Sequence, residues 1–178
     1  MFPLGLDDLQ GYHPQQVNAF VQRIKLQFDD PSRDLMTASI VSSVRFDLIQ
    51  GGYQIATVDQ TLAKLADTLE VREISQRIIR VGKAGVLEEL THNLQVISDI
   101  LDQKPSEMFK KASNGYSKKL VFELLDTVRV TRGKLISPSA FEIRTREFGR
   151  SSSGLSRVEV NEFCSLLASA INKQSALS

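Results

Sequence analysis

Cysteine, histidine and long apolar runs are all scarce in this chain of 178 residues. Its one cysteine, Cys164, cannot form a disulfide within the chain. The two histidines, His13 and His92, stand far apart and have no second ligand at a metal-binding spacing. We therefore interpret these three side chains as structural or surface residues, not as a nucleophile, an acid–base group or metal ligands.

Signals for export, membrane spanning and catalysis are likewise missing. No run of about 18 apolar residues is present, so we expect no spanning helix. The amino-terminal segment lacks the basic start and the long apolar core of a signal peptide. Together with the single cysteine, this predicts a cytoplasmic location. No glycine-rich loop for phosphate is evident, and we predict a protein that is not an enzyme and takes no cofactor.

The chain does contain a short sequence motif, called a phrase below, that recurs four times with incomplete similarity. Its copies lie at 10–20, 51–61, 114–124 and 153–163. In each copy a glycine is followed by a large residue, and a valine stands five positions after that residue. A phenylalanine precedes the glycine by six positions in the last three copies. Such an internal repeat indicates that the fold is built from repeated structural units. The shared positions are Gly11, Tyr12 and Val17; Phe46, Gly52, Tyr53 and Val58; Phe109, Gly115, Tyr116 and Val121; and Phe148, Gly154, Leu155 and Val160.

Each phrase predicts a tight turn that leads into an amphipathic helix. Glycine adopts a positive φ at little cost, which favours the turn. The positions that follow are apolar at spacings of three and four, as in Val58, Leu62, Leu65 and Leu69. Upstream, residues 41–46 have the composition of an extended arm. We interpret the repeated residues mainly as packing residues, because a unit of about 35 residues cannot bury its own apolar stripe.

The spacing of the four glycines predicts two halves, since neighbouring glycines are 41, 63 and 39 residues apart. We expect a first pair of units at 1–80, a connecting amphipathic helix at 81–104 and a second pair at 105–178. The predicted fold class is mainly α, with units of short extended arm, glycine turn and amphipathic helix packed as helical pairs. Residues 83–103 carry a coiled-coil-like seam, which makes this helix a candidate for joining the halves or for homo-oligomer formation. The seam consists of Leu87, Leu90, Leu94, Ile97 and Leu101.

Three of the phrases resemble the N-terminal domain of the DivIVA family: Gly-Tyr-x4-Val-Asn-x-Phe at 11–20, Phe-x5-Gly-Tyr-x4-Val-Asp at 46–59 and Val-Asn-Glu-Phe at 160–163. Segments 37–46 and 137–148 also resemble the lead-in of that domain, a short helical start followed by an arm that ends in phenylalanine. The resemblance implies a bacterial cell-division or polar-growth scaffold that is not an enzyme. Such a scaffold binds the inner face of the cytoplasmic membrane, self-associates through helices and recruits partner proteins.

The contact residues that the resemblance implies are only partly matched. In membrane-binding members of the family, an exposed apolar residue and a basic residue precede the turn glycine. Here only Leu9 is apolar at those positions, and no base is present. Related adaptors bind peptides with the turn tyrosine and with carboxylates six and ten positions later. Tyr53 and Asp59 keep two of those three features, which makes them candidate peptide contacts.

A run of basic residues offers a second candidate surface. Seven bases and two acids lie between 129 and 157, although the whole chain has a net charge of +1. Such a cluster is typical of contact with anionic lipid headgroups or nucleic acid, and the alternative is a solvated arm paired with acids elsewhere. Few aromatic residues are interleaved for base stacking, which disfavours nucleic acid. The bases are Arg129, Arg132, Lys134, Arg144, Arg146, Arg150 and Arg157.

Together these patterns predict a scaffold or adaptor of the bacterial division or polar-growth machinery, peripheral to the inner face of the cell membrane. Its expected partners are other cell-division or cell-envelope proteins. Two alternatives stay open. One is a soluble protein–protein adaptor without membrane affinity, and the other is a nucleic-acid-binding regulator that uses the basic run.

Overall fold

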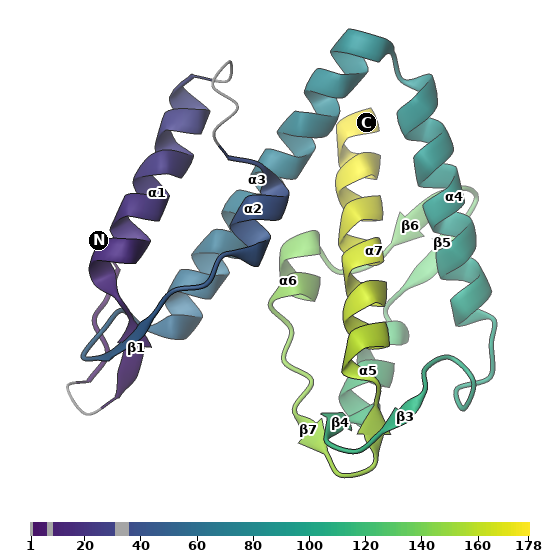
Figure 1. Ribbon diagram of the computed structural model, residues 1–178. Coiled ribbons are helices and arrows are strands. Elements are labelled where there is room, and N and C mark those ends of the chain that lie inside the picture. The colour runs from purple at the N-terminus through teal and green to yellow at the C-terminus, as the bar shows by residue number, and fades with distance from the viewer. Residues whose placement is uncertain (1, 7–8, 31–35) are drawn as a thin grey trace. The chain divides into compact units, whose positions relative to one another are not determined.

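The protein is mainly α-helical and divides into two compact units, Met1–Glu70 and Val71–Ser178 (Figure 1). The computed structural model describes residues 2–6, 9–30 and 36–178, so three residues of the amino-terminal segment considered above (1, 7 and 8) lie outside the described residues. The boundary between the units falls inside the long helix α3 (Ile55–Val81). Among the described residues, no helix combines the length and the hydropathy that are needed to cross a bilayer.

The described residues of the first unit form three helices and one small two-stranded sheet. Besides the first part of α3, its elements are β1 (Gln10–Tyr12), α1 (Pro14–Asp29), α2 (Ala38–Ser43) and β2 (Leu48–Gln50). Proline at the start of α1 is well placed, because the first helical N–H has no partner within the helix. The three helices share one hydrophobic cluster, which includes Val17, Ile24, Val41, Val58 and Leu69.

Helix α2 corrects part of the expectation for residues 41–46. We predicted an extended arm there, but the helix continues to Ser43 and the backbone leaves it only at Val44. The cause lies upstream, where the Thr37 hydroxyl accepts a hydrogen bond from the Ile40 N–H at 3.2 Å. This N-cap satisfies a donor that the first turn of a helix otherwise leaves free.

The second unit surrounds one long helix, α7 (Arg157–Leu177), which packs against α4 (Ala84–Leu101) and α6 (Ala140–Arg144). A capping box between Ser139 and Glu142 starts α6. The remaining elements are β3 (Lys111–Ala112), β4 (Gly115–Tyr116), α5 (Lys118–Leu125), β5 (Arg129–Thr131), β6 (Lys134–Ile136), β7 (Arg150–Ser151) and β8 (Gly154–Leu155).

Helix α4 is the helix that we expected at 81–104 as a connector between two halves. It instead belongs to the second unit, together with the end of α3. Three residues of its seam, Leu90, Leu94 and Ile97, are buried in the hydrophobic cluster of that unit. The seam is therefore covered by the chain itself, and these three side chains are not available to a second copy. Leu87 is the exposed member, at 55%.

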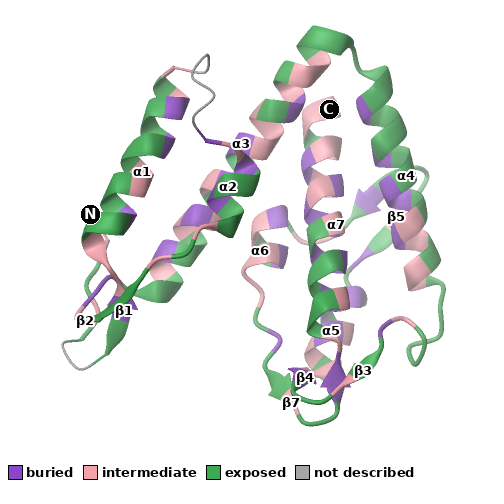
Figure 2. Ribbon diagram, in the orientation of Figure 1, coloured by how far each residue is buried: buried purple, intermediate pink, exposed green. Residues whose placement is uncertain are grey.

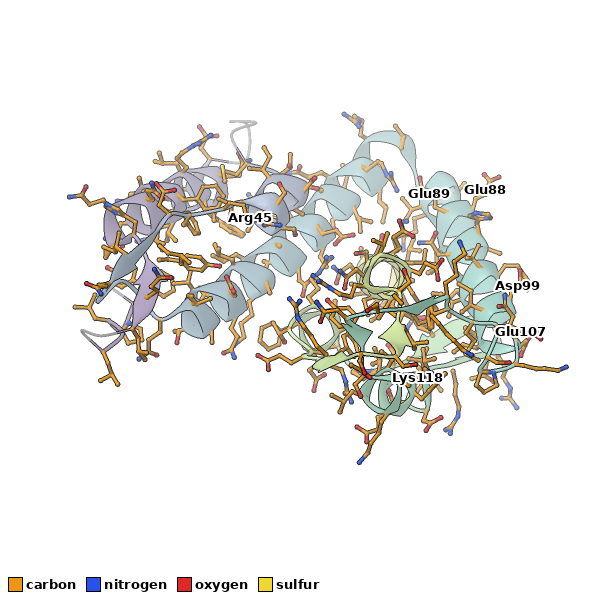
Figure 3. The ribbon with its side chains drawn as sticks, turned by 60° about the horizontal axis from the view of Figure 1, so that its bottom comes forward. Arg45, Glu88, Glu89, Asp99, Glu107 and Lys118 are labelled. Carbon is orange, nitrogen blue, oxygen red and sulfur yellow. The ribbon has the colours of Figure 1, made fainter. Side chains whose placement is uncertain are left out.

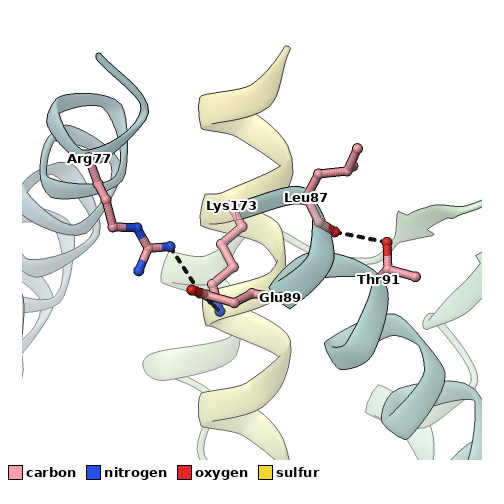
Figure 4. Close-up of polar contacts among 5 residues, drawn as sticks. All are labelled: Arg77, Leu87, Glu89, Thr91 and Lys173. Carbon is pink, nitrogen blue, oxygen red and sulfur yellow. Dashed lines mark hydrogen bonds and ion pairs between the residues drawn. The ribbon is translucent and has the colours of Figure 1, made fainter. Parts of the chain in front are cut away.

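An ion-pair network ties the end of α3, α4 and α7 together (Figure 4). The Glu89 carboxylate accepts a hydrogen bond from the Arg77 guanidinium at 2.9 Å and lies 3.4 Å from the Lys173 ammonium. Both cations hold the pKa of Glu89 below its usual value, with the Arg77 hydrogen bond as the largest cause. Three helices of the second unit thus meet at one carboxylate.

Candidate functional site

The two glycines of the first unit lie against each other's backbone. A Cβ atom placed on Gly11 would lie 2.5 Å from the carbonyl oxygen of Tyr53, and one on Gly52 would lie 2.5 Å from that of Gly11. The N–H of Tyr12 donates to the Tyr53 carbonyl at 2.9 Å, and the N–H of Tyr53 donates to the Tyr12 carbonyl at 2.8 Å. The backbone segments therefore cross at a distance that no side chain allows.

The second unit repeats this contact between Gly115 and Gly154. A Cβ atom on Gly115 would overlap the Leu155 carbonyl oxygen, and one on Gly154 would lie 2.5 Å from the Gly115 carbonyl carbon. None of the four turn glycines has the positive φ that we expected; that conformation occurs instead at the preceding residue in two copies, Gly51 and Asn114. Close approach of two backbones, not turn geometry, is thus what requires glycine here.

The same strand order surrounds each pair of glycines. In the first unit, Leu4 is paired with Tyr53, Tyr53 with Tyr12, and Tyr12 with Leu48, all antiparallel. Directly paired residues place their side chains on one face, so these four form a row across the strands, which we call the first row.

The second row lies in the four-stranded sheet of the second unit, whose order is β3-β8-β4-β7. Its antiparallel pairs are Lys111 with Leu155, Leu155 with Tyr116, and Tyr116 with Arg150. The centre of each row is therefore aromatic or aliphatic. The outer members are leucines in the first row and basic residues in the second.

The residues that begin the following helices differ in the same way. Three positions after each glycine stand Pro14 and Ile55 in the first unit, and Lys118 and Arg157 in the second; Lys118 is labelled in Figure 3. We call the outer members of a row, together with the first residues of the helices that follow, the rim of that row. The rim carries apolar side chains in the first unit and basic side chains in the second.

Apolar side chains are exposed together at the end of the first unit, which we call the first turn end. It comprises β2, exposed along its whole length (Figure 2), and the described residues before β1, namely 4–6 and 9. The described residues before β1 lie beside the turn, since the Gly5 N–H donates to the Gly52 carbonyl at 2.7 Å and the Gly51 N–H to the Leu9 carbonyl at 3.0 Å. The exposed residues are Leu4 (60%), Leu6 (68%), Leu9 (54%), Leu48 (46%) and Ile49 (37%).

Each turn tyrosine of the first unit is hydrogen-bonded to a side chain on the helix that follows the other tyrosine. The Tyr53 hydroxyl donates to the side-chain oxygen of Asn18 at 3.2 Å, and the Tyr12 hydroxyl is hydrogen-bonded to the Asp59 carboxylate. Burial raises the pKa of Asp59, while the Tyr12 hydrogen bond and the positive charge of Arg45 (Figure 3) partly offset this rise. Burial is also the main cause of the raised pKa of Tyr12, followed by the Asp59 charge.

This arrangement bears on the candidate peptide contacts. Tyr53 is only 3% exposed and its hydroxyl is already bonded to Asn18, so its ring is not a surface on which a peptide could lie. The Asp59 carboxylate is hydrogen-bonded to the tyrosine of the other phrase, Tyr12. The two predicted contacts therefore belong to different hydroxyl–acceptor pairs.

The remaining repeated residues occupy packing positions. All four valines of the phrases, Val17, Val58, Val121 and Val160, are buried. Each lead-in phenylalanine of α2 and α6 contacts a turn tyrosine: the Phe46 and Tyr12 ring centroids are 5.3 Å apart, and those of Phe148 and Tyr116 are 5.2 Å apart. Phe109 packs against Phe163 in the same cluster as Phe148.

The predicted basic cluster is divided among several places in the second unit. Arg129, Arg132 and Lys134 lie on the exposed β5–β6 hairpin, whose turn uses positive φ at Arg132 and Gly133. Arg144 ends α6, and Arg146 influences the buried thiol of Cys164. Arg150 belongs to the second row, and the Arg157 guanidinium lies 5.7 Å from the centre of the Tyr116 ring.

The candidate nucleophile and ligands offer little chemistry. Burial raises the pKa of Cys164 to about 11, so the thiol stays protonated at neutral pH and is a poor nucleophile. His13 precedes α1 and His92 lies on α4. Among the described residues, no group of three or more histidine, cysteine, aspartate or glutamate side chains is placed to hold a metal ion.

Several rim residues were missed by sequence reasoning, namely Leu4, Leu6, Leu48 and Ile49 in the first unit and Lys111 and Lys118 in the second. Strand register brings them to the glycine turns, and register is not readable from strands of two or three residues. The only available signal was the fixed offset of four residues before the glycine, which Leu48, Lys111 and Arg150 share. No protein-family model, curated protein or solved structure matches this chain.

Proposed function

We propose that this chain is a non-enzymatic scaffold or adaptor of the bacterial cell-division or polar-growth machinery that attaches to the inner face of the cytoplasmic membrane. The resemblance of its phrases to the DivIVA N-terminal domain supports this role. In our proposal, four units of arm, glycine turn and helix are joined in tandem, and each pair replaces a dimer of single units. The crossings of Gly11 with Gly52 and of Gly115 with Gly154 support the pairing.

The observation that carries the membrane part is the first turn end. Five exposed leucine and isoleucine side chains gather there beside two crossed backbone segments. Contiguous exposed apolar patches mark contacts with partners or membranes. Insertion of such side chains among lipid acyl chains removes their apolar surface from water, which contributes about 25 cal/mol per Å². The turn end would enter the interface without any spanning helix.

Co-sedimentation with vesicles of phosphatidylcholine and phosphatidylglycerol tests this proposal. The variant Leu6→Ser/Leu9→Ser keeps the backbone but removes two of the most exposed leucines. Because about 2–3 kcal/mol of binding is lost with two inserted side chains, vesicle affinity should fall at least tenfold. The matched control is Ile79→Ser/Val81→Ser, which changes two apolar residues outside the turn end that are, as a pair, even more exposed, at 86% and 66%. Equal pelleting of wild type and the turn-end variant would contradict membrane insertion.

The cellular part of the proposal has its own test. A fluorescent fusion expressed in the native bacterium should concentrate at division septa or at growing poles. The Leu6→Ser/Leu9→Ser variant should lose this enrichment, and the Ile79→Ser/Val81→Ser control should keep it. Uniform cytoplasmic fluorescence of the wild-type fusion would argue against a role in division or polar growth.

A further inference from the structure

Four basic side chains around the second row have no ion-pair partner in the part of the chain that the structure describes. Among the described residues, no ion pair involves Lys111, Lys118, Arg150 or Arg157. Their sequence neighbours behave differently. Lys110 lies 3.1 Å from the Glu159 carboxylate, and Lys119 lies 4.0 Å from that of Glu123. All four bases around the second row are therefore unpaired among the described residues, as are Arg129 and Lys134 of the β5–β6 hairpin.

Two of the four are neighbours of one tyrosine, Tyr116. Arg150 is the direct cross-strand partner of Tyr116, which places the two Cβ atoms about 5 Å apart. The Arg157 guanidinium lies over the same ring, 5.7 Å from its centre. The Tyr116 hydroxyl has no hydrogen-bond partner among the described residues. The Arg157 guanidinium and an unbonded hydroxyl thus lie at a half-buried ring whose cross-strand neighbour is a second arginine, Arg150.

Stability alone gives no reason for these charges. Lys118 and Arg157 stand at the first positions of α5 and α7, where the helix dipole disfavours positive charge. At the corresponding positions of the first unit the residues are apolar, and the acid beside its tyrosine, Asp59, corresponds to the neutral Asn161. At the outer positions of the rows, at the first helical positions and beside the tyrosine, the charge differences therefore make the second unit more positive.

We infer that the second row binds a short acidic segment of a partner protein, whose carboxylates pair with Arg150 and Arg157 beside Tyr116. Guanidinium groups match carboxylates with two parallel hydrogen bonds, and an adjacent ring face holds the guanidinium plane in place. The inference rests on the adaptor role proposed above. It concerns the second unit only, so a failure of vesicle binding at the first turn end leaves it unaffected.

A short peptide fits this surface better than an extended polyanion does. Acidic residues are interleaved with the bases, since Glu107 precedes β3, Glu147 precedes β7, and Glu159 lies in the first turn of α7. These negative charges weaken the positive electrostatic potential at a distance from the surface. A membrane plane or a nucleic acid would bring phosphates against them, whereas one or two carboxylates would meet only the arginine pair.

Fluorescence anisotropy of labelled hexaglutamate, titrated with the full chain at low salt, tests the inference. The variant Arg150→Gln/Arg157→Gln should weaken binding about tenfold, because two charge-assisted pairs are lost. The control Arg129→Gln/Lys134→Gln removes the same charge from the β5–β6 hairpin and should change affinity by less than about twofold. Equal losses in the two variants would overturn the assignment, because they would indicate attraction by net charge alone.

Further measurements separate the remaining ligands and guard against misfolding. The charge reversal Arg150→Glu/Arg157→Glu should lose hexaglutamate binding and acquire binding of hexalysine, which an unfolded variant would not do selectively. Phosphatidylglycerol vesicles and a single-stranded oligonucleotide serve as competitors. If either binds more tightly than hexaglutamate through the same two arginines, the acidic-peptide assignment is wrong. Absence of any hexaglutamate binding by the wild type would also overturn it.

Discussion

At the scale of single residues, Gly115 shows how one missing side-chain atom sets the geometry of the second unit. An added methyl group would overlap the Leu155 carbonyl oxygen, and the strands that cross there would have to separate. We expect Gly115→Ala to lower the free energy of unfolding by about 3 kcal/mol, as overpacking of a rigid contact does. Urea denaturation followed by circular dichroism measures this change.

Gly85 supplies the matched control within the same unit. It lies in α4, and a Cβ atom there would meet nothing within 4 Å. Gly85→Ala should therefore raise the free energy of unfolding by about 0.5–1 kcal/mol, since alanine is the better helix former. If Gly115→Ala were as well tolerated as Gly85→Ala, the backbones would not approach as closely as described.

The residue scale also shows what sequence reasoning could reach. The four glycines and the buried valines were found because one side chain type recurs at a fixed spacing. The reason for the glycines was mistaken, because close backbone approach and positive φ leave the same mark in a sequence. Arg150 and Arg157 were included in the predicted basic run, but their position at Tyr116 was not predicted. It depends on the strand register that pairs Arg150 with Tyr116 and on the start of α7, which places Arg157 over the Tyr116 ring.

At the scale of elements, helices were more predictable than strands. The seam from Leu87 to Leu101 repeats over many residues, and α4 occupies nearly the predicted range. The β5–β6 hairpin was not predicted, because three residues per strand carry little periodicity. Its signal was local: a two-residue turn ending in Gly133 between short β-branched stretches. The amide of Gln174 then holds β6 by bonding both the N–H (2.8 Å) and the carbonyl (3.1 Å) of Leu135.

The network at Glu89 gives a prediction about how helices α3, α4 and α7 of the second unit stay together. Glu89→Gln should lower the free energy of unfolding by about 0.5–1 kcal/mol at neutral pH, because the carboxylate is partly exposed and screened by water. Glu88→Gln is the control, since Glu88 is exposed and has no ion pair among the described residues. Thermal or urea unfolding at several pH values measures both variants.

The pH dependence of the difference in unfolding free energy shows whether the charge of Glu89 causes it. The folded pKa of Glu89 is held below its usual value of 4.5, so its contribution is fully present above that value. It should disappear as the pH falls through the folded pKa and the carboxylate is protonated in both states. The difference between wild type and Glu89→Gln should shrink over the same range, and it should shrink in high salt. A difference that persists in acid would point to packing instead of charge.

At the scale of the whole molecule, the two units share a strand framework but carry opposite charge. Residues 1–70 contain five bases and nine acids, and residues 71–178 contain seventeen bases and twelve acids. In the proposals made above, the apolar rim of the acidic unit contacts the membrane and the basic rim of the basic unit contacts an acidic peptide. Packing requires large side chains at the centre of each row. The two units therefore differ in character at exposed positions, and no sequence pattern singles these positions out.

This view predicts that binding can be transferred between the units. The variant Leu48→Arg/Ile55→Arg/Asp59→Asn gives the first row the rim of the second, with the equivalents of Arg150, Arg157 and Asn161. Because all three changed positions are at least partly exposed, the fold should be retained. Hexaglutamate affinity should rise at least about fivefold over that of a control with the same added charge.

The control for this transfer is Ile40→Arg/Ile79→Arg/Asp29→Asn, which alters exposed residues away from both rows. It adds the same charge without placing two guanidinium groups beside a tyrosine ring. Anisotropy titrations of both variants, each in the background Arg150→Gln/Arg157→Gln, isolate the new site from the original one. If the two variants bound hexaglutamate equally, affinity would follow net charge, and the row would not be the element that recognises the ligand.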